Sequence, residues 1–248
     1  MFYPPLLDLD NAPELDVLAI AAHPDDIEQT CGGTLMRMQE MGYLTGALDL
    51  TAGDMGTRGT PEIRMKEARD AASILRLSFR ENLQMPDARL ENNIALKMTL
   101  MGVIRRLKPK TVVLPYWEAR HPDHSMASIL GFEASFLAGL AKMDDQAPPH
   151  RPRKVVYVSS YAPVAPSFVV DITPYFDRRM ESLFAYKSQY AELVDGASLF
   201  PNREEITDRL RSIARYYGNL IGAKYGEPYV VKETMSVGDL VAMGSRTF

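Results

Sequence analysis

The sequence is poor in cysteine, because Cys31 is the single one among 248 residues. This excludes an intramolecular disulfide framework and is typical of a reducing cytoplasm. Basic residues are not in excess either: 28 Lys and Arg stand against 32 Asp and Glu, which argues against binding to nucleic acid or an anionic membrane. No apolar run approaches the ~20 residues that span a bilayer. Residues 1–16 lack a basic start followed by a long apolar stretch, so we expect no signal peptide and a cytoplasmic location.

The rest of the composition is that of an ordinary folded chain, with 46% hydrophobic and 24% charged residues. Apolar segments of strand length are followed by segments of helical composition, which predicts a Rossmann-like, doubly wound α/β fold with a mostly parallel sheet flanked by helices. The predicted strands are 16–22, 45–50, 111–114, 155–159 and 168–172. The predicted helices are 32–41, 60–75, 92–107, 124–141, 173–190 and 203–221. We expect a single domain over 1–248, with a core from about 16 to 225 and a C-terminal tail over 226–248.

Three of the four histidines lie in two similar short motifs. The motif HPDD at 23–26 follows the first predicted strand, and HPDH at 121–124 follows the strand 111–114. Such motifs also form ordinary turns. However, ligands of a doubly wound sheet bind at the carboxyl ends of its strands, where both motifs are expected. The sequence therefore predicts that the two motifs face one another in one site.

The residue types in these motifs indicate a metal site. Imidazoles together with one carboxylate, and an open position for water, are typical of catalytic zinc. The same ligands suit Fe²⁺ or another divalent metal, and residue type alone does not separate them. The motifs hold more carboxylates and imidazoles than a metal needs, and the remaining ones are suited to be a general base and a general acid. This combination favours hydrolysis of an amide or ester.

The segment AAHPDDIEQTCGGTL, with HPDH about a hundred residues later, resembles the LmbE-like (PIG-L) N-acetylglucosamine deacetylases. The segments LPYWEARHPDHSMAS, PSFVVDI and AYKSQY resemble the branch that deacetylates N-acetyl-α-D-glucosaminyl L-malate in bacillithiol biosynthesis. The resemblance implies a zinc-dependent N-deacetylase that acts on a small N-acetylated glucosaminyl substrate and assembles as a homo-oligomer, a trimer or hexamer.

The resemblance also assigns roles to residues. It implies that His23, Asp26 and His124 bind the metal, and that Asp25 is the general base. It implies that His121 assists the oxyanion and the leaving amine, and that Asp123 orients His121.

Four further residues are predicted to bind substrate. The resemblance implies that Arg64 contacts sugar hydroxyls and that Tyr225 is a mobile tyrosine near the reacting group. Arg58, in a glycine-containing loop at 53–59, and Arg120 flank the predicted metal edge. A guanidinium binds a carboxylate with two parallel hydrogen bonds, so either arginine suits the malyl group.

Three other functions are compatible with parts of this pattern. A broader N-acetylglucosamine or chitooligosaccharide deacetylase would use the same site. A non-haem iron oxygenase would share two histidines and a carboxylate, but such sites often occupy all-β folds. A non-catalytic nucleotide-binding domain would require a glycine fingerprint after the first strand, where acidic residues stand instead.

Overall fold

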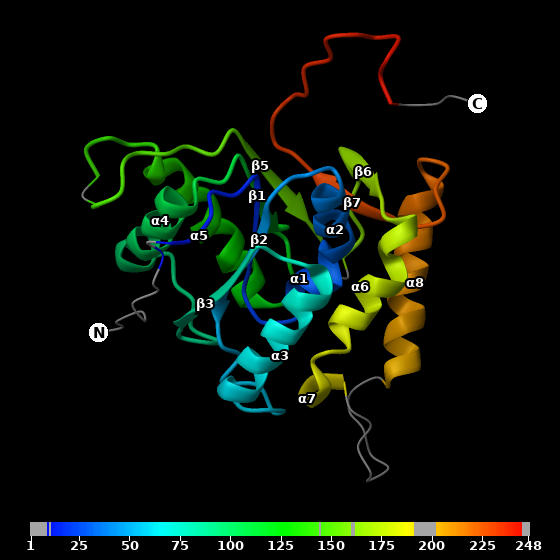
Figure 1. Ribbon diagram of the computed structural model, residues 1–248, viewed down its shortest axis with the longest axis horizontal. Coiled ribbons are helices and arrows are strands. Elements are labelled where there is room, and N and C mark those ends of the chain that lie inside the picture. Colours follow the sequence, from blue (N-terminus) through cyan, green and yellow to red (C-terminus); the bar gives the residue numbers. More distant parts are fainter. Residues whose placement is uncertain (1–8, 10, 144, 160–161, 191–201, 245–248) are drawn as a thin grey trace.

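Buried strands alternate with covering helices along most of the chain in the computed structural model (Figure 1). The structure describes residues 9, 11–143, 145–159, 162–190 and 202–244. One sheet holds the strands β1 (Val17–Ala21), β2 (Thr45–Thr51), β3 (Phe79–Met85), β4 (Thr111–Pro115), β5 (Lys154–Val158), β6 (Phe168–Asp171) and β7 (Gly226–Val230). Their order is β3-β2-β1-β4-β5-β7-β6. Pairs among β1 to β5 are parallel, and β7 runs antiparallel to both of its neighbours. The predicted fold class is confirmed.

Helices cover both faces of this sheet. They are α1 (Asp26–Thr30), α2 (Gly32–Glu40), α3 (Pro61–Leu75), α4 (Ile94–Leu107), α5 (Pro122–Ala138), α6 (Phe176–Leu183), α7 (Lys187–Tyr190) and α8 (Arg203–Asn219), with a 3₁₀ turn at Thr173–Tyr175. In Figure 1, α4 and α5 lie on one side of the sheet and α1, α2 and α3 on the other. Among the described residues, no helix is both long and apolar enough to cross a membrane.

The central strand β1 shows why a continuous apolar run indicates a buried parallel strand. Leu18 and Ile20 pack in the core cluster below α4 and α5, whereas Val17, Ala19 and Ala21 pack in the cluster on the opposite face. A parallel strand covered on both faces needs apolar side chains at every position. The chain emerges from β1 directly into the HPDD motif, so this edge of the sheet positions the site.

The strands β3 and β7 were not predicted from the sequence, because buried charged residues interrupt their apolar pattern. In β3, Arg80 is buried and forms ion pairs with Glu28 at 2.8 Å and with Asp49 at 2.8 Å. In β7, the buried Glu227 accepts hydrogen bonds from the main-chain N–H groups of Gly33 (3.0 Å) and Thr34 (2.8 Å) at the start of α2. The strand β7 lies within the sheet, between β5 and β6.

The helix predicted over 173–190 is wrong as a single element. It divides into the 3₁₀ turn, α6 and α7. The break after α6 places Tyr186 fully inside the protein, where its hydroxyl accepts a 2.9 Å hydrogen bond from Arg80. Tyr186 thus lies in the turn between α6 and α7, where its hydroxyl contacts the buried side chains of Arg80 and Glu28.

Candidate metal centre

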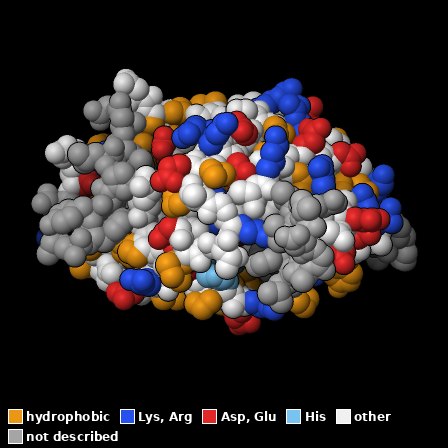
Figure 2. Space-filling view, turned by 90° about the horizontal axis from the view of Figure 1, so that it is seen from below, with side chains coloured by type: hydrophobic (Ala, Val, Ile, Leu, Met, Phe, Trp, Pro, Cys, Tyr) orange, Lys and Arg blue, Asp and Glu red, His pale blue; other side chains and the backbone are white. Residues whose placement is uncertain are grey.

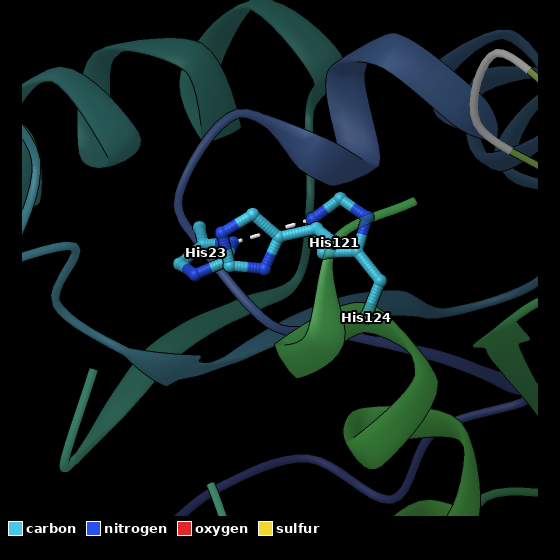
Figure 3. Close-up of side chains that lie close together, drawn as sticks. All are labelled: His23, His121 and His124. Atoms are coloured by element: carbon cyan, nitrogen blue, oxygen red, sulfur yellow. Dashed lines mark hydrogen bonds between the residues drawn. The ribbon is translucent and has the colours of Figure 1, made fainter. Parts of the chain in front are cut away.

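Three side chains from two strand ends converge on one point. His23 and Asp26 follow β1, and His124 lies in the first turn of α5, after β4. Nδ1 of His23 is 3.3 Å from Nε2 of His124 and 3.5 Å from Oδ2 of Asp26. Nε2 of His124 is 3.2 Å from Oδ1 of Asp26. Figure 3 shows the contact between the two imidazoles as a dashed line.

These separations fit a metal ion. Ligand atoms bonded to a tetrahedral zinc at about 2.0–2.2 Å lie roughly 3.3–3.6 Å from one another. The separations of 3.2–3.5 Å between the three side chains are close to this spacing, with Asp26 facing His23 through Oδ2 and His124 through Oδ1. Two nitrogens and a carboxylate are donor types that zinc accepts. The residues therefore fit a divalent metal held by His23, Asp26 and His124.

The imidazole of His23 is oriented from its far side by Asp87. Nε2 of His23 lies 3.1 Å from Oδ1 of Asp87 and 3.5 Å from Oδ2 of Asp123. A hydrogen bond from Nε2–H to Asp87 leaves the Nδ1 lone pair directed at the metal position, which is the usual arrangement behind a metal-binding histidine. The other oxygen of Asp87 accepts a 2.8 Å hydrogen bond from the N–H of Met55 in the glycine-containing loop.

The charge balance of this cluster favours a cation. Burial lowers the pKa of His23, but hydrogen bonds to Asp123, Asp26 and Asp87 outweigh that effect and raise it to about 12. Burial likewise opposes ionisation of Asp26, yet His124 and His23 hold its pKa well below the ordinary value. Three carboxylates around one imidazole thus stabilise positive charge at this position, whether a proton or a metal supplies it.

Asp25, which precedes Asp26, has an unusual backbone geometry. Its φ is 99°, in the left-handed region that non-glycine residues rarely occupy. Such strain persists where the surrounding structure enforces it, and it concentrates at functional sites. The hydroxyl of Tyr190 donates a 2.7 Å hydrogen bond to Oδ2 of Asp25, and Nη2 of Arg64 lies 3.7 Å from Oδ1. Burial and the charge of Asp26 raise the pKa of Asp25 to about 7 against the opposing effects of these two neighbours.

His121 is exposed at the N-terminal end of α5. Its ring centroid is 4.7 Å from that of His23 and 5.1 Å from that of His124 (Figure 3). Nδ1 of His121 accepts a 3.2 Å hydrogen bond from the main-chain N–H of Asp123, so the neutral ring carries its proton on Nε2. Burial, followed by the charges of His23 and His124, lowers the pKa of His121. Figure 2 shows a histidine side chain at the molecular surface that is seen from below Figure 1.

Asp123 contacts His121 through the main chain. The carboxylate of Asp123 instead accepts a 2.7 Å hydrogen bond from the N–H of Ala88 and faces His23. The Asp123 carboxylate thus faces His23 and not His121. A role of Asp123 in orienting His121 stays a prediction.

The predicted substrate arginines differ in their surroundings. Arg64 is buried and donates hydrogen bonds to the carbonyl oxygens of Pro24 (2.7 Å) and Gly53 (3.3 Å). Arg58 donates a 2.8 Å hydrogen bond to the carbonyl oxygen of Gln189 in α7. Arg120 is exposed in the loop before α5. Contacts of these side chains with substrate stay predictions, and the Arg64 guanidinium binds the loop that carries Asp25.

Tyr225 lies in a different environment from the one expected for a mobile substrate contact. Its side chain is buried in a core cluster, and its ring stacks on Phe176 with 4.1 Å between centroids. The hydroxyl of Tyr190, by contrast, reaches the site, where it donates a hydrogen bond to Asp25. As placed in this structure, Tyr225 is a core residue, and its contact with substrate stays a prediction.

Sequence reasoning missed Asp87 and Tyr190. Asp87 follows β3, a strand whose polar residues concealed it, and its position at the carboxyl edge of the sheet becomes apparent only once β3 is placed. Tyr190 lies in a short helix that pattern analysis joined to its predecessor. Both residues contact site residues that are distant in sequence, which no local pattern reveals.

Comparison with known proteins places this site in a family context. Residues 18–135 match the family PIG-L, described as GlcNAc-PI de-N-acetylase. The chain is 31% identical to the diacetylchitobiose deacetylase of Thermococcus kodakarensis over 223 residues, which cover 85% of this chain and 80% of that protein. It is 27% identical to a probable N-acetyl-α-D-glucosaminyl L-malate deacetylase 2 of Bacillus anthracis, over 73% of this chain and 84% of that one. The crystal structure of the conserved protein TT1542 from Thermus thermophilus superimposes with a TM-score of 0.82 at 39% identity, covering 90% of this chain and 98% of that one.

Proposed function

Because the chain belongs to the PIG-L family and is a metal-dependent N-deacetylase, we propose that it removes the acetyl group from an N-acetylglucosamine unit of a short chitooligosaccharide such as diacetylchitobiose. The observation that carries this proposal is the triangle formed by His23, Asp26 and His124, at separations suited to a tetrahedral metal. A buried carboxylate, Asp25, and an exposed imidazole, His121, stand beside this triangle.

Zinc is the metal that we propose for this centre. Its usual catalytic sites provide three protein ligands and one open position, which two histidines and Asp26 supply here. When bound, zinc supplies Lewis acidity that polarises a carbonyl group and makes water more acidic. Fe²⁺ or another divalent ion fits the same donor types.

The protein side chains move the protons of the reaction. Asp25 is proposed to accept a proton from the attacking water, because a base with a pKa of about 7 is half ionised near neutral pH. Nε2–H of His121 is proposed to stabilise negative charge on the carbonyl oxygen by donating a hydrogen bond to it, and the proton that Asp25 takes from water is proposed to pass to the leaving nitrogen. The C–N bond breaks with both electrons going to nitrogen, and acetate and a free glucosamine amine are released.

Neighbouring side chains hold the base in place for this task. The Tyr190 hydroxyl and the Arg64 guanidinium contact different oxygens of Asp25, and Arg64 also donates hydrogen bonds to the carbonyl oxygens of Pro24 and Gly53. Arg64 is thus proposed to fix the main chain around Asp25 in addition to any contact with the sugar.

N-acetyl-α-D-glucosaminyl L-malate is the second candidate substrate. The 27% identity to the Bacillus anthracis protein supports it, whereas the longer and higher identity to the chitobiose deacetylase supports the saccharide. A malyl group carries two carboxylates and calls for arginine side chains directed at it. Arg64 and Arg58 both bind main-chain carbonyl oxygens, which leaves Arg120 as the predicted arginine best placed for a malyl group.

Acetate release separates these substrates. We expect the zinc-loaded protein to release acetate from diacetylchitobiose with a higher kcat/KM than from N-acetylglucosaminyl malate. A higher kcat/KM on N-acetylglucosaminyl malate than on diacetylchitobiose, with a difference that disappears in Arg120→Ala, would establish the malyl substrate instead. No acetate from either compound, with zinc bound and the protein folded, would refute the proposed function.

The homo-oligomer expected from the sequence stays a prediction. In the described part of the tail, Leu240 and Val241 are 79% and 96% exposed, so a second chain would have apolar side chains to cover. Light scattering that yields the mass of one chain would contradict it.

A further inference from the structure

A small, mostly apolar cavity of about 20 Å³ adjoins two of the proposed metal ligands, Asp26 and His124. It is bounded by α1 and by the carboxyl-end residues of β1, β4 and β5. Asp26 and His124 form part of its wall. Most of the remaining wall is aliphatic, and includes Ala21, Ile27 and Val158. The cavity therefore lies between two proposed metal ligands and apolar side chains of the sheet and α1.

The size and lining of the cavity restrict what can occupy it. A cavity of about 10–15 Å³ holds a single water molecule, so the cavity beside Asp26 and His124 has room for about one group of that size. Water in a buried site needs two to four polar partners. The wall includes Thr30, Cys31, Asp26 and His124. Thr30 already donates a 2.7 Å hydrogen bond to the carbonyl oxygen of Asp26, and the Asp26 carboxylate already contacts His23 and His124. A methyl group is of comparable size and forms its contacts with aliphatic carbon. The chemistry of the wall thus favours a methyl group.

We propose that this cavity receives the methyl group of the acetyl substituent and confines the enzyme to two-carbon acyl groups. The inference rests on the proposed function and adds to it the acyl specificity. When an acetamide carbonyl approaches the metal ligands, its carbon carries one methyl group. A cavity that adjoins Asp26 and His124 is positioned to receive that methyl group. A propionyl group would bring one further carbon, for which the cavity has no space.

Val158 is the side chain best suited to test this limit. It is the last residue of β5, is 4% exposed and lines the cavity. Val158→Ala removes two methyl groups from the wall. Val156 provides a matched control, because it lies on the same face of the same strand, is 7% exposed and belongs to the same core cluster, but does not line the cavity. Val156→Ala therefore reproduces the loss of packing without enlarging the cavity.

The experiment measures binding of acetate, propionate and butyrate to the zinc-loaded protein by calorimetry. One methylene group typically changes discrimination by about 10- to 200-fold, so we expect wild type to bind acetate at least about tenfold more tightly than propionate. Val158→Ala should reduce this ratio by about tenfold, and Val156→Ala should leave it unchanged. Rates on N-acetyl- and N-propionylglucosamine should follow the same order in each protein.

Two results would overturn the inference. One is equal binding of acetate and propionate by wild type, a measurement that requires no variant. The other is the same change in ratio for Val158→Ala and Val156→Ala. Selective acetate binding that responds to Val158→Ala, without hydrolysis of any N-acetylglucosamine compound, would refute the proposed function and leave the acyl cavity supported.

Discussion

The hydroxyl of Tyr190 donates a 2.7 Å hydrogen bond to Oδ2 of Asp25, across 165 positions of sequence. Tyr190 is held there by its short helix, α7. Oγ of Ser188, two residues before Tyr190, donates a 2.6 Å hydrogen bond to Glu67, and Nε2 of Gln189 donates a 2.7 Å hydrogen bond to the carbonyl oxygen of Arg58. The position of the proposed base thus depends on a helix that supplies none of the metal ligands.

Tyr190→Phe should lower kcat while leaving KM and zinc content near the wild-type values. A hydrogen bond to a charged group contributes about 1.5–3 kcal/mol, and 1.4 kcal/mol corresponds to a factor of ten, so we expect kcat to fall by about 10- to 150-fold. Tyr216→Phe is the control, because Tyr216 is 60% exposed on α8. A kcat equal to wild type would show that Tyr190 does not position Asp25.

Metal binding should separate His124→Ala from Asp25→Asn. Removing His124 leaves two of the three proposed ligands, whereas Asp25→Asn leaves all three. Zinc at a hundredfold excess over its Kd stabilises a folded protein by about 2.7 kcal/mol, which raises Tm by roughly 5–10 °C for a chain of this size. We expect this shift in wild type and Asp25→Asn but not in His124→Ala. An undiminished shift in His124→Ala would remove His124 from the ligand set.

Asp87→Asn should weaken zinc binding although Asp87 is not a proposed ligand. Its carboxylate accepts from Nε2 of His23 and from the N–H of Met55. Loss of such an outer partner typically costs about 10- to 100-fold in metal affinity or activity. Competition with a chelating dye measures the affinity, and Asp54→Asn, an exposed carboxylate of the same loop, is the control. Equal affinities for the two variants would contradict the orienting role.

Arg80→Ala should destabilise the fold strongly. Its guanidinium pairs with Asp49 and Glu28, and all three side chains are at most 5% exposed. Breaking a buried ion pair by removing one partner typically costs about 3–5 kcal/mol, because a buried charge remains uncompensated. Arg211→Ala, which removes an exposed ion pair with Asp208, should cost at most about 1 kcal/mol. Urea unfolding of both variants tests this, and similar midpoints would show that the buried network contributes no more than a surface pair.

The elements that local patterns specify were predictable from sequence. Thr60 caps α3 with Pro61 in its first turn, and the alternating faces of β1 require the apolar run that revealed it. The meeting of the two histidine motifs was predicted because both follow strands of a doubly wound sheet, and β1 and β4 are parallel neighbours in the structure.

The elements that depend on distant partners were not predictable in this way. Arg80 makes β3 look polar until Asp49 and Glu28 are placed beside it. Glu227 does the same for β7 until α2 is known to begin at its carboxylate. The roles of Asp87 and Tyr190 likewise arise from contacts with His23 and Asp25 that span the fold.

Acetate release by the zinc-loaded protein tests the central claim most directly. Wild type and Asp25→Asn are compared on diacetylchitobiose at equal zinc content, each before and after chelation. We predict release by wild type that chelation abolishes and added zinc restores, with Asp25→Asn slower by about 10²- to 10⁴-fold because an amide cannot accept the proton of water. Release by Asp25→Asn at the wild-type rate, or release that persists in the chelated protein, would contradict the account.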